Sequence, residues 1–253
     1  MENIIDLREF AIDVVRSSND IFKKFNNYSI INSEGKDLKA EIDIKLNQHI
    51  TEKLSLTNIP IISEEGNNNI LDIKRKCWIV DPLDGTFNFI RNFNFYSISI
   101  ALWENKKPVF GVILDITNSN IYFTNSKNSF LNGKEILVSK TQTLEQSVLS
   151  TGFSTQIDLS TSKLNNLIHS IQKFKKIRAI GSAAMSLCLV AEGVFDVYYE
   201  NDIFFWDVAA GIDLVNKSGG SVYYRFKENS FLMEVLCTNK NLLKESKEIL
   251  IND

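Results

Sequence analysis

Residues 78–89 read Trp-Ile-Val-Asp-Pro-Leu-Asp-Gly-Thr-Phe-Asn-Phe, and this stretch decides both the fold and the chemistry of the chain. Its short apolar start predicts a buried strand. Pro82 disfavours a helical conformation at Asp81, so we expect the strand to end there and the chain to turn at once. Such a turn brings the carboxylates of Asp81 and Asp84 together and exposes the carbonyl of Leu83.

Two neighbouring carboxylates repel each other, and a divalent cation removes that conflict. Gly85 lets a ligand approach the backbone closely. If a helix starts at Gly85-Thr86, its free N–H groups point to the same place and can hold phosphate oxygens. The motif taken alone also fits a simple Asp-Pro turn in which Asp84 caps a helix.

Other acidic residues give the motif possible partners. Glu64 and Glu65 follow a predicted strand, and one of them can bridge metals while its neighbour hydrogen-bonds a nucleophilic water; a solvated turn is the alternative. Asp207 stands at a predicted helix start beside Trp206, where a buried carboxylate needs a cation or donors; a plain helix cap is the alternative. Asp43 is uninformative by itself. Gly181-Ser182-Ala183-Ala184 offers bare backbone at a helix start, suited to a hydroxylated substrate or to close packing.

Composition excludes several classes of protein. The 253 residues carry a net charge of −3 without a long basic block, so nucleic acid is not an expected partner. Apolar runs stay below the roughly 18 residues that a membrane span needs, and the acidic start Met1–Asp6 does not resemble a signal peptide. The three cysteines lie far apart in apolar settings, which predicts buried thiols in the cytoplasm. The two histidines are isolated, so any metal site is built on oxygen, which suits Mg²⁺, Ca²⁺ or Mn²⁺.

Periodicity predicts mixed helices and strands without strict β-α-β alternation, hence layered helices and sheets with a meander in the middle. One domain over 1–253 is expected, with a soft boundary near residue 140. We expect helices at 3–25, 40–56, 160–173, 182–192, 207–217 and 240–251. We expect strands at 28–31, 59–62, 76–80, 96–103, 108–114, 120–124, 146–151, 176–180, 195–199, 221–225 and 234–238.

Together these pieces resemble the inositol monophosphatase family of the magnesium-dependent, lithium-sensitive phosphatase superfamily. The matching segments run in order over most of the chain, and the Asp-Pro-Leu-Asp-Gly-Thr and Trp-Asp-x-Ala-Ala-Gly pair is highly specific. They are Asp43, Glu64-Glu65, 81–89, Asn132-Gly133, 181–184, 196–200, 206–211 and Gly219-Gly220. The resemblance implies an α+β fold, a layered αβαβα sandwich, and usually a homodimer.

The resemblance also implies site roles. Metal binding of two to three Mg²⁺ ions would fall to Glu64, Asp81, the Leu83 carbonyl, Asp84 and Asp207. Water activation would fall to Glu65 and to Thr86 supported by Asp43. Phosphate would lie on the N–H groups of Gly85 and Thr86, and the substrate hydroxyls would meet Gly181, Ser182, Ala183 and Glu200. Lys36 resembles a lysine of a mobile loop that closes near the site.

The chain departs from the family pattern at Arg91–Asn94, at 127–130 and at 39–42, and the first departure bears on substrate identity. The favoured substrate is inositol-1-phosphate or a related small sugar or polyol phosphate. Fructose-1,6-bisphosphate, possibly as a second activity, and histidinol phosphate stay open, whereas the Thr-x-Asn-Phe segment disfavours nucleotide bisphosphates. A regulatory binding protein that has lost turnover is the non-enzymatic alternative.

Overall fold

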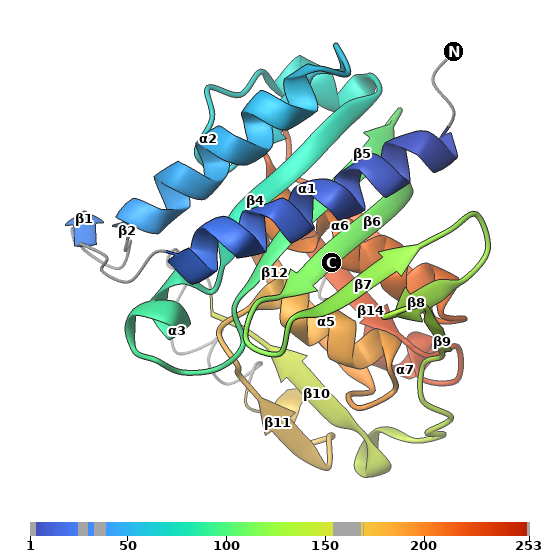
Figure 1. The fold of residues 1–253 in the computed structure, drawn as a ribbon. Helices are drawn as coiled ribbons and strands as arrows, with labels where there is room; N and C mark the ends of the chain where they lie inside the picture. The colour runs from blue at the N-terminus through green and yellow to red at the C-terminus, as the bar shows by residue number, and fades with distance from the viewer. Residues whose placement is uncertain (1–3, 25–29, 33–38, 154–167, 169, 252–253) are drawn as a thin grey trace.

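A computed structural model describes residues 4–24, 30–32, 39–153, 168 and 170–251 of the chain. Its described part has six α-helices, drawn in Figure 1. They are α1 (Ile4–Lys24), α2 (Glu41–Ser55), α3 (Thr86–Ile90), α5 (Ala183–Ala191), α6 (Phe205–Lys217) and α7 (Leu243–Leu250). Most of the helix expected at 160–173 lies outside the described residues, and Lys36 lies outside them too; of the described positions, 168, 170 and 171 are helical.

The strands form two large sheets and one small one. The seven-stranded sheet has the order β3-β4-β5-β6-β7-β8-β9, the five-stranded sheet β11-β10-β12-β14-β13, and β1 pairs with β2. The first sheet comprises β3 (Ile61–Ser63), β4 (Cys77–Asp84), β5 (Ser97–Glu104), β6 (Lys107–Asp115), β7 (Asn120–Thr124), β8 (Ser129–Leu131) and β9 (Lys134–Ile136). The other strands are β1 (Ile30–Asn32), β2 (Lys39–Ala40), β10 (Val148–Thr151), β11 (Lys176–Arg178), β12 (Val197–Phe204), β13 (Ser221–Phe226) and β14 (Leu232–Thr238).

Helices and sheets alternate in layers, which confirms the expected αβαβα sandwich. In Figure 1, α1 and α2 cover one face of the seven-stranded sheet. Their apolar stripes pack on the alternate residues of β4, β5 and β6 that face them, in one hydrophobic cluster. A second cluster joins α5 and α6 to both sheets, and a third places α7 on the outer face of the five-stranded sheet.

The central helix α6 approaches the large sheet unusually closely. A Cβ on Gly111 of β6 would lie 2.5 Å from the Ala210 carbonyl oxygen, and a Cβ on Gly211 would lie 2.4 Å from Leu187 of α5. The Trp103 indole donates to the carbonyl of Ala209 at 3.1 Å. The small residues after Asp207 therefore fix the distance between helix and sheet.

The meander from Tyr96 to Thr124 is confirmed as β5, β6 and β7, an antiparallel run. The sequence-based prediction missed the hairpin of β8 and β9. Its turn, Asn132-Gly133, has both φ angles positive, at 50° and 83°, as a two-residue hairpin turn requires. The Asn-Gly pair carried this signal, but both strands are only three residues long.

Candidate active site

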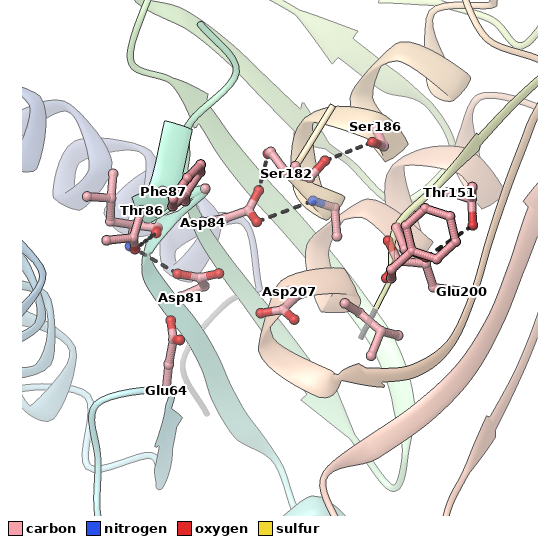
Figure 2. A pocket seen from close by; sticks show the side chains of 17 residues that line it. Glu64, Asp81, Asp84, Thr86, Phe87, Thr151, Ser182, Ser186, Glu200 and Asp207 are labelled. Carbon is pink, nitrogen blue, oxygen red and sulfur yellow. Dashed lines mark hydrogen bonds between the residues drawn. The ribbon is translucent and has the colours of Figure 1, made fainter. Parts of the chain in front are cut away.

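A pocket of about 300 Å³ opens where the two large sheets and α6 meet, and it collects five of the acidic residues singled out from the sequence, but not Asp43 or Glu65 (Figure 2). Its described lining comes from β4 and α3, from the ends of β3, β10, β11 and β12, and from α5 and α6. The lining residues are Glu64, Asp81, Leu83, Asp84, Gly85, Thr86, Phe87, Thr151, Gly152, Phe153, Gly181, Ser182, Ala183, Ser186, Glu200, Ile203 and Asp207.

Asp81 and Asp84 lie on one strand with a bulge between them. The expectation that the strand ends at Asp81 is wrong: β4 continues to Asp84, which pairs with Ser97, while Asp81 pairs with Ser99. One extra residue therefore sits on β4, which bends the strand locally. Pro82 has no N–H to donate to a ladder, and the N–H of Leu83 donates to Asp81 Oδ1 at 3.0 Å instead.

The start of α5 holds the carboxylate of Asp84. Oδ2 accepts hydrogen bonds from the Ser182 hydroxyl and, at 3.1 Å, from the backbone N–H of Ala184, while the N–H of Ala183 donates to Oδ1 at 3.2 Å. Ser97 adds a donor at 3.3 Å. Burial raises the pKa of Asp84 to about 6, although these donors oppose the rise. The expected bare backbone at this helix start is thus partly engaged by Asp84.

The other acidic side chains face each other with few donors. Burial raises the pKa of Asp81 well above its usual range, and repulsion from Glu64, Asp84 and Asp207 adds to the rise. Although part of Glu64 is exposed, its carboxylate lies in the acidic pocket, where lost solvation and repulsion from Asp43 raise its pKa to about 8.

Asp207 was expected at the start of a helix, but α6 begins two residues earlier, at Phe205. Asp207 therefore stands third in the helix, and its carboxylate accepts a hydrogen bond from the backbone N–H of Phe204, the residue before the helix. Burial, and repulsion from Glu64 and Asp84, hold the pKa of Asp207 well above its usual value.

Thr86 connects the pocket to α2. Its hydroxyl lies 2.8 Å from Asp43 Oδ1 and 3.0 Å from the carbonyl oxygen of Leu83. Asp43 is buried in the first turn of α2 and does not itself line the pocket. Glu65 is half-buried in the turn after β3 and is likewise absent from the described lining.

Glu200 occupies the part of the pocket formed by the five-stranded sheet. It lies on β12, is buried, and accepts a hydrogen bond from the Tyr198 hydroxyl at 3.1 Å. A Cβ on Gly152 would lie 2.4 Å from Glu200 Oε1, so the absence of a side chain at Gly152 makes room for the carboxylate. Burial raises the pKa of Glu200 to about 7.

The model of the inositol monophosphatase family matches residues 5–253, nearly the whole chain. The chain belongs to the inositol monophosphatase family. The family is one of phosphatases and is generally magnesium-dependent.

Known members of the family cover most of the chain. Inositol monophosphatase 2 of Solanum lycopersicum is 35% identical over 244 residues, which are 88% of this chain and 87% of that protein. The Nus factor SuhB of Xylella fastidiosa is 35% identical over 79% of this chain and 73% of that protein. Among solved structures, the extragenic suppressor protein SuhB of Bartonella henselae has a TM-score of 0.84 at 26% identity, covering 97% of this chain and 98% of that chain.

A relative named for two activities also matches. A fructose-1,6-bisphosphatase/inositol-1-monophosphatase of Thermotoga maritima is 34% identical over 191 residues, 74% of this chain and 71% of that protein. Membership in the family therefore leaves the substrate open.

The donor set suits the magnesium ion that the family generally uses. Glu64, Asp81, Asp84 and Asp207 offer only oxygen ligands, as Mg²⁺ prefers. Burial first, and then repulsion among neighbouring carboxylates, raises the pKa values of Glu64, Asp81 and Asp207, and a cation would relieve that repulsion. As the side chains stand, no three described His, Cys, Asp or Glu residues form a group arranged to hold a metal ion. Residue type and electrostatics fit the ion.

Several residues that shape the site were not predicted to do so. Asn88 of α3 is buried and donates to the carbonyl oxygens of Phe95 and Ile180, at 2.8 and 2.7 Å, so it ties α3 to the turn before α5. The other unpredicted lining residues are Phe87, Thr151, Gly152, Phe153, Ser186 and Ile203. In the sequence, the strand expected at 146–151 was the only feature that pointed to any of these residues, because residues that follow the end of a strand often line a site.

One expectation about the surroundings of the site is not supported. Arg91–Asn94, which was expected to influence substrate choice, is exposed beyond α3 and absent from the described lining of the pocket.

In the described residues, none of the helices is both long and apolar enough to cross a bilayer.

Proposed function

We propose that the chain is a Mg²⁺-dependent phosphate monoesterase that hydrolyses inositol-1-phosphate or a related small sugar or polyol phosphate. The observation that carries this proposal is the convergence of four carboxylates from three elements on one pocket. Glu64 comes from the end of β3, Asp81 and Asp84 from β4, and Asp207 from α6. Four carboxylates in one pocket destabilise the fold unless a cation compensates them, so a functional reason for their presence is expected.

Two to three Mg²⁺ ions would be held by Glu64, Asp81, Asp84 and Asp207 together with the carbonyl of Leu83. When bound, Mg²⁺ lowers the pKa of a coordinated water and stabilises negative charge on phosphate and leaving oxygen. We assign to this chain's own residues the tasks of holding the phosphate, orienting the water and binding the leaving alcohol.

Thr86 is suited to orient the attacking water. Its hydroxyl is fixed between Asp43 and the Leu83 carbonyl, so its position is set before substrate binds. The N–H groups of Gly85 and Thr86 are assigned to the phosphate oxygens. Glu65 is proposed as a second residue that activates the water, although it does not belong to the described lining of the pocket.

The leaving alcohol is assigned to the side of the pocket formed by Gly181, Ser182, Ala183 and Glu200. Water attacks phosphorus in line and the bond from phosphorus to the ester oxygen breaks. One of the two protons of the water ends on the leaving alcohol, and the other stays on the released phosphate. This direct displacement requires no phosphorylated side chain.

Phosphate release tests the proposal. The purified chain is assayed with inositol-1-phosphate, fructose-1,6-bisphosphate, histidinol phosphate and adenosine bisphosphate, with and without Mg²⁺. We expect phosphate release from inositol-1-phosphate, and this release should stop when EDTA removes the metal. An absence of release from the whole panel would reject the proposal.

Two alternatives rest on specific relatives. A fructose-1,6-bisphosphatase activity, alone or in addition, is favoured by the match to the Thermotoga maritima protein of that name. A regulatory binding role is favoured by the match to the Nus factor SuhB of Xylella fastidiosa, and the retention of all four carboxylates argues against the loss of catalysis.

We further propose that the chain forms one domain, assembles as a homodimer, acts in the cytoplasm and is inhibited by lithium. The family membership and the three buried free cysteines support these proposals. Light scattering of the purified chain tests the dimer, and the phosphate assay in LiCl tests the inhibition.

A further inference from the structure

We infer that Glu200, seated against Gly152, makes this enzyme select phosphate esters whose leaving alcohol is neutral or positively charged and reject those that carry a second phosphate. This inference rests on the proposed phosphatase function and narrows its substrate class. It concerns the part of the pocket that the metal ligands do not occupy.

The first step is the charge of the pocket. Five carboxylates line it, and four of them are assigned to metal ions. Glu200 is the fifth, and it lies on β12, across the pocket from β4, as Figure 2 shows. At pH 8, above its pKa of about 7, the Glu200 carboxylate carries a negative charge that ions held by the other four carboxylates do not neutralise.

The second step is the fixed position of that charge. Glu200 is buried, the Tyr198 hydroxyl donates to its Oε1, and the backbone of Gly152 lies directly against it. A Cβ at position 152 would come within 2.7 Å of Cδ and both carboxylate oxygens. The carboxylate cannot stay in place beside any larger residue, so Gly152 is a positioning residue for Glu200.

The third step is the surroundings of the carboxylate. Phe153 and Ile203 line the pocket together with Glu200, and Phe153 is 59% exposed. Among the described lining residues, Lys, Arg and His do not occur, so none of them offers a positive charge to a second phosphate. A hydroxyl or an ammonium group can donate to Glu200, whereas a phosphate dianion is repelled by it.

A substrate series tests the charge selection. We measure kcat/KM for histidinol phosphate, inositol-1-phosphate and fructose-1,6-bisphosphate, whose leaving alcohols carry positive, zero and negative charge. The wild-type chain should prefer the first two over the bisphosphate by at least tenfold. In Glu200→Gln, which keeps an acceptor for Tyr198, the ratio of bisphosphate to inositol phosphate should rise at least tenfold, chiefly through a lower KM for the bisphosphate.

Glu234→Gln is the matched control, because Glu234 is an equally buried glutamate on the neighbouring strand β14, outside the described pocket lining. It should leave the ratio unchanged. A wild-type chain that prefers the bisphosphate, or a Glu200→Gln chain with an unchanged ratio, would overturn the inference. Failure to release phosphate from any ester would instead reject the proposed function.

A double-mutant cycle tests the role of Gly152. Gly152→Ala should lower kcat/KM for inositol-1-phosphate about tenfold in the wild-type background, because it displaces the carboxylate. In a Glu200→Ala background the same change should have less than a twofold effect. Equal losses in both backgrounds would show that Gly152 acts independently of Glu200 and would remove it from the inference.

Discussion

At the scale of single residues, the site combines groups that destabilise the metal-free protein. Asp81 is almost fully buried, and three other carboxylates raise its pKa. Its Oδ1 accepts a hydrogen bond from the N–H of Leu83, and an asparagine can preserve that bond through its own Oδ1. Replacing Asp81 by asparagine therefore removes its negative charge with little change in the shape of the side chain.

Asp81→Asn should lower kcat/KM by about 10²-fold or more, because it removes a ligand of the proposed metal site. The same change should raise the melting temperature of the metal-free protein at pH 8 by a few degrees, where about 1 kcal/mol corresponds to about 2–4 °C. Phosphate assays and calorimetry in EDTA measure the two effects. Asp13→Asn, an exposed change on α1, should alter neither kcat/KM nor the melting temperature. Full activity in Asp81→Asn would refute the metal-site assignment.

Thr86 allows an equally specific test of the water-orienting role. Thr86→Ala should lower kcat by about 10²-fold, the lower end of what a positioned proton-transfer group contributes, while KM changes little. Thr86→Ser keeps the hydroxyl that meets Asp43 and should stay within about tenfold of wild type. If the alanine and serine variants were equally active, the hydroxyl would have no role in the reaction.

At the scale of secondary-structure elements, the site depends on how closely α6 approaches the large sheet. Asp207 enters the pocket from α6, and the rest of that helix packs on β6 through Gly111. The backbone of Ala210 leaves no space for a side chain at position 111. The close contact therefore sets the position of one proposed metal ligand relative to the others.

Gly111→Ala should lower the free energy of unfolding by about 1–3 kcal/mol, because its Cβ would meet backbone atoms that cannot turn away. Urea unfolding monitored by tryptophan fluorescence measures the change. Gly66→Ala serves as the control, since its Cβ would meet neighbours no closer than 3.2 Å. If both substitutions had the same small effect, the close packing of α6 on β6 would not be rigid.

At the scale of the whole molecule, the acidic pocket couples folding to pH and to metal. The folded-state pKa values of Asp84 and Glu64, about 6 and about 8, lie above the usual values of 3.8 and 4.5. Between those limits the folded protein binds more protons than the unfolded chain. The contribution of these two groups to the free energy of unfolding is therefore highest below about pH 4 to 4.5, and it falls as the pH rises through their pKa values in the folded state. The loss should be complete near pH 8.

The melting temperature in EDTA should therefore contain a component that decreases between pH 5 and pH 8. Mg²⁺ binds the deprotonated carboxylates, so its stabilising effect should be larger at pH 8 than at pH 6. At about 100 times the dissociation constant the gain is about 2.7 kcal/mol. Calorimetry with and without Mg²⁺ at both pH values measures it; a Mg²⁺ effect independent of pH would show that these carboxylates do not bind the ion.

The sequence by itself determined the layered fold and most of the proposed site. Helical and alternating periodicities depend on local spacing, so they located α1, α2 and the meander to within a few residues. The resemblance assigned Glu64, Asp81, Asp84 and Asp207 to one metal site, because such motifs carry chemistry at fixed spacings. All four line one pocket.

Only the tertiary structure decided which residues surround those carboxylates. The bulge in β4, the donation from α5 to Asp84 and the space that Gly152 leaves for Glu200 all join segments distant in the chain. Local sequence patterns do not encode contacts of that kind, since they arise from the packing of β4 and α5 and of β10 and β12. The sequence determined which carboxylates belong to the pocket, and the packing of the sheets decided that Gly152 leaves the space in which Glu200 sits.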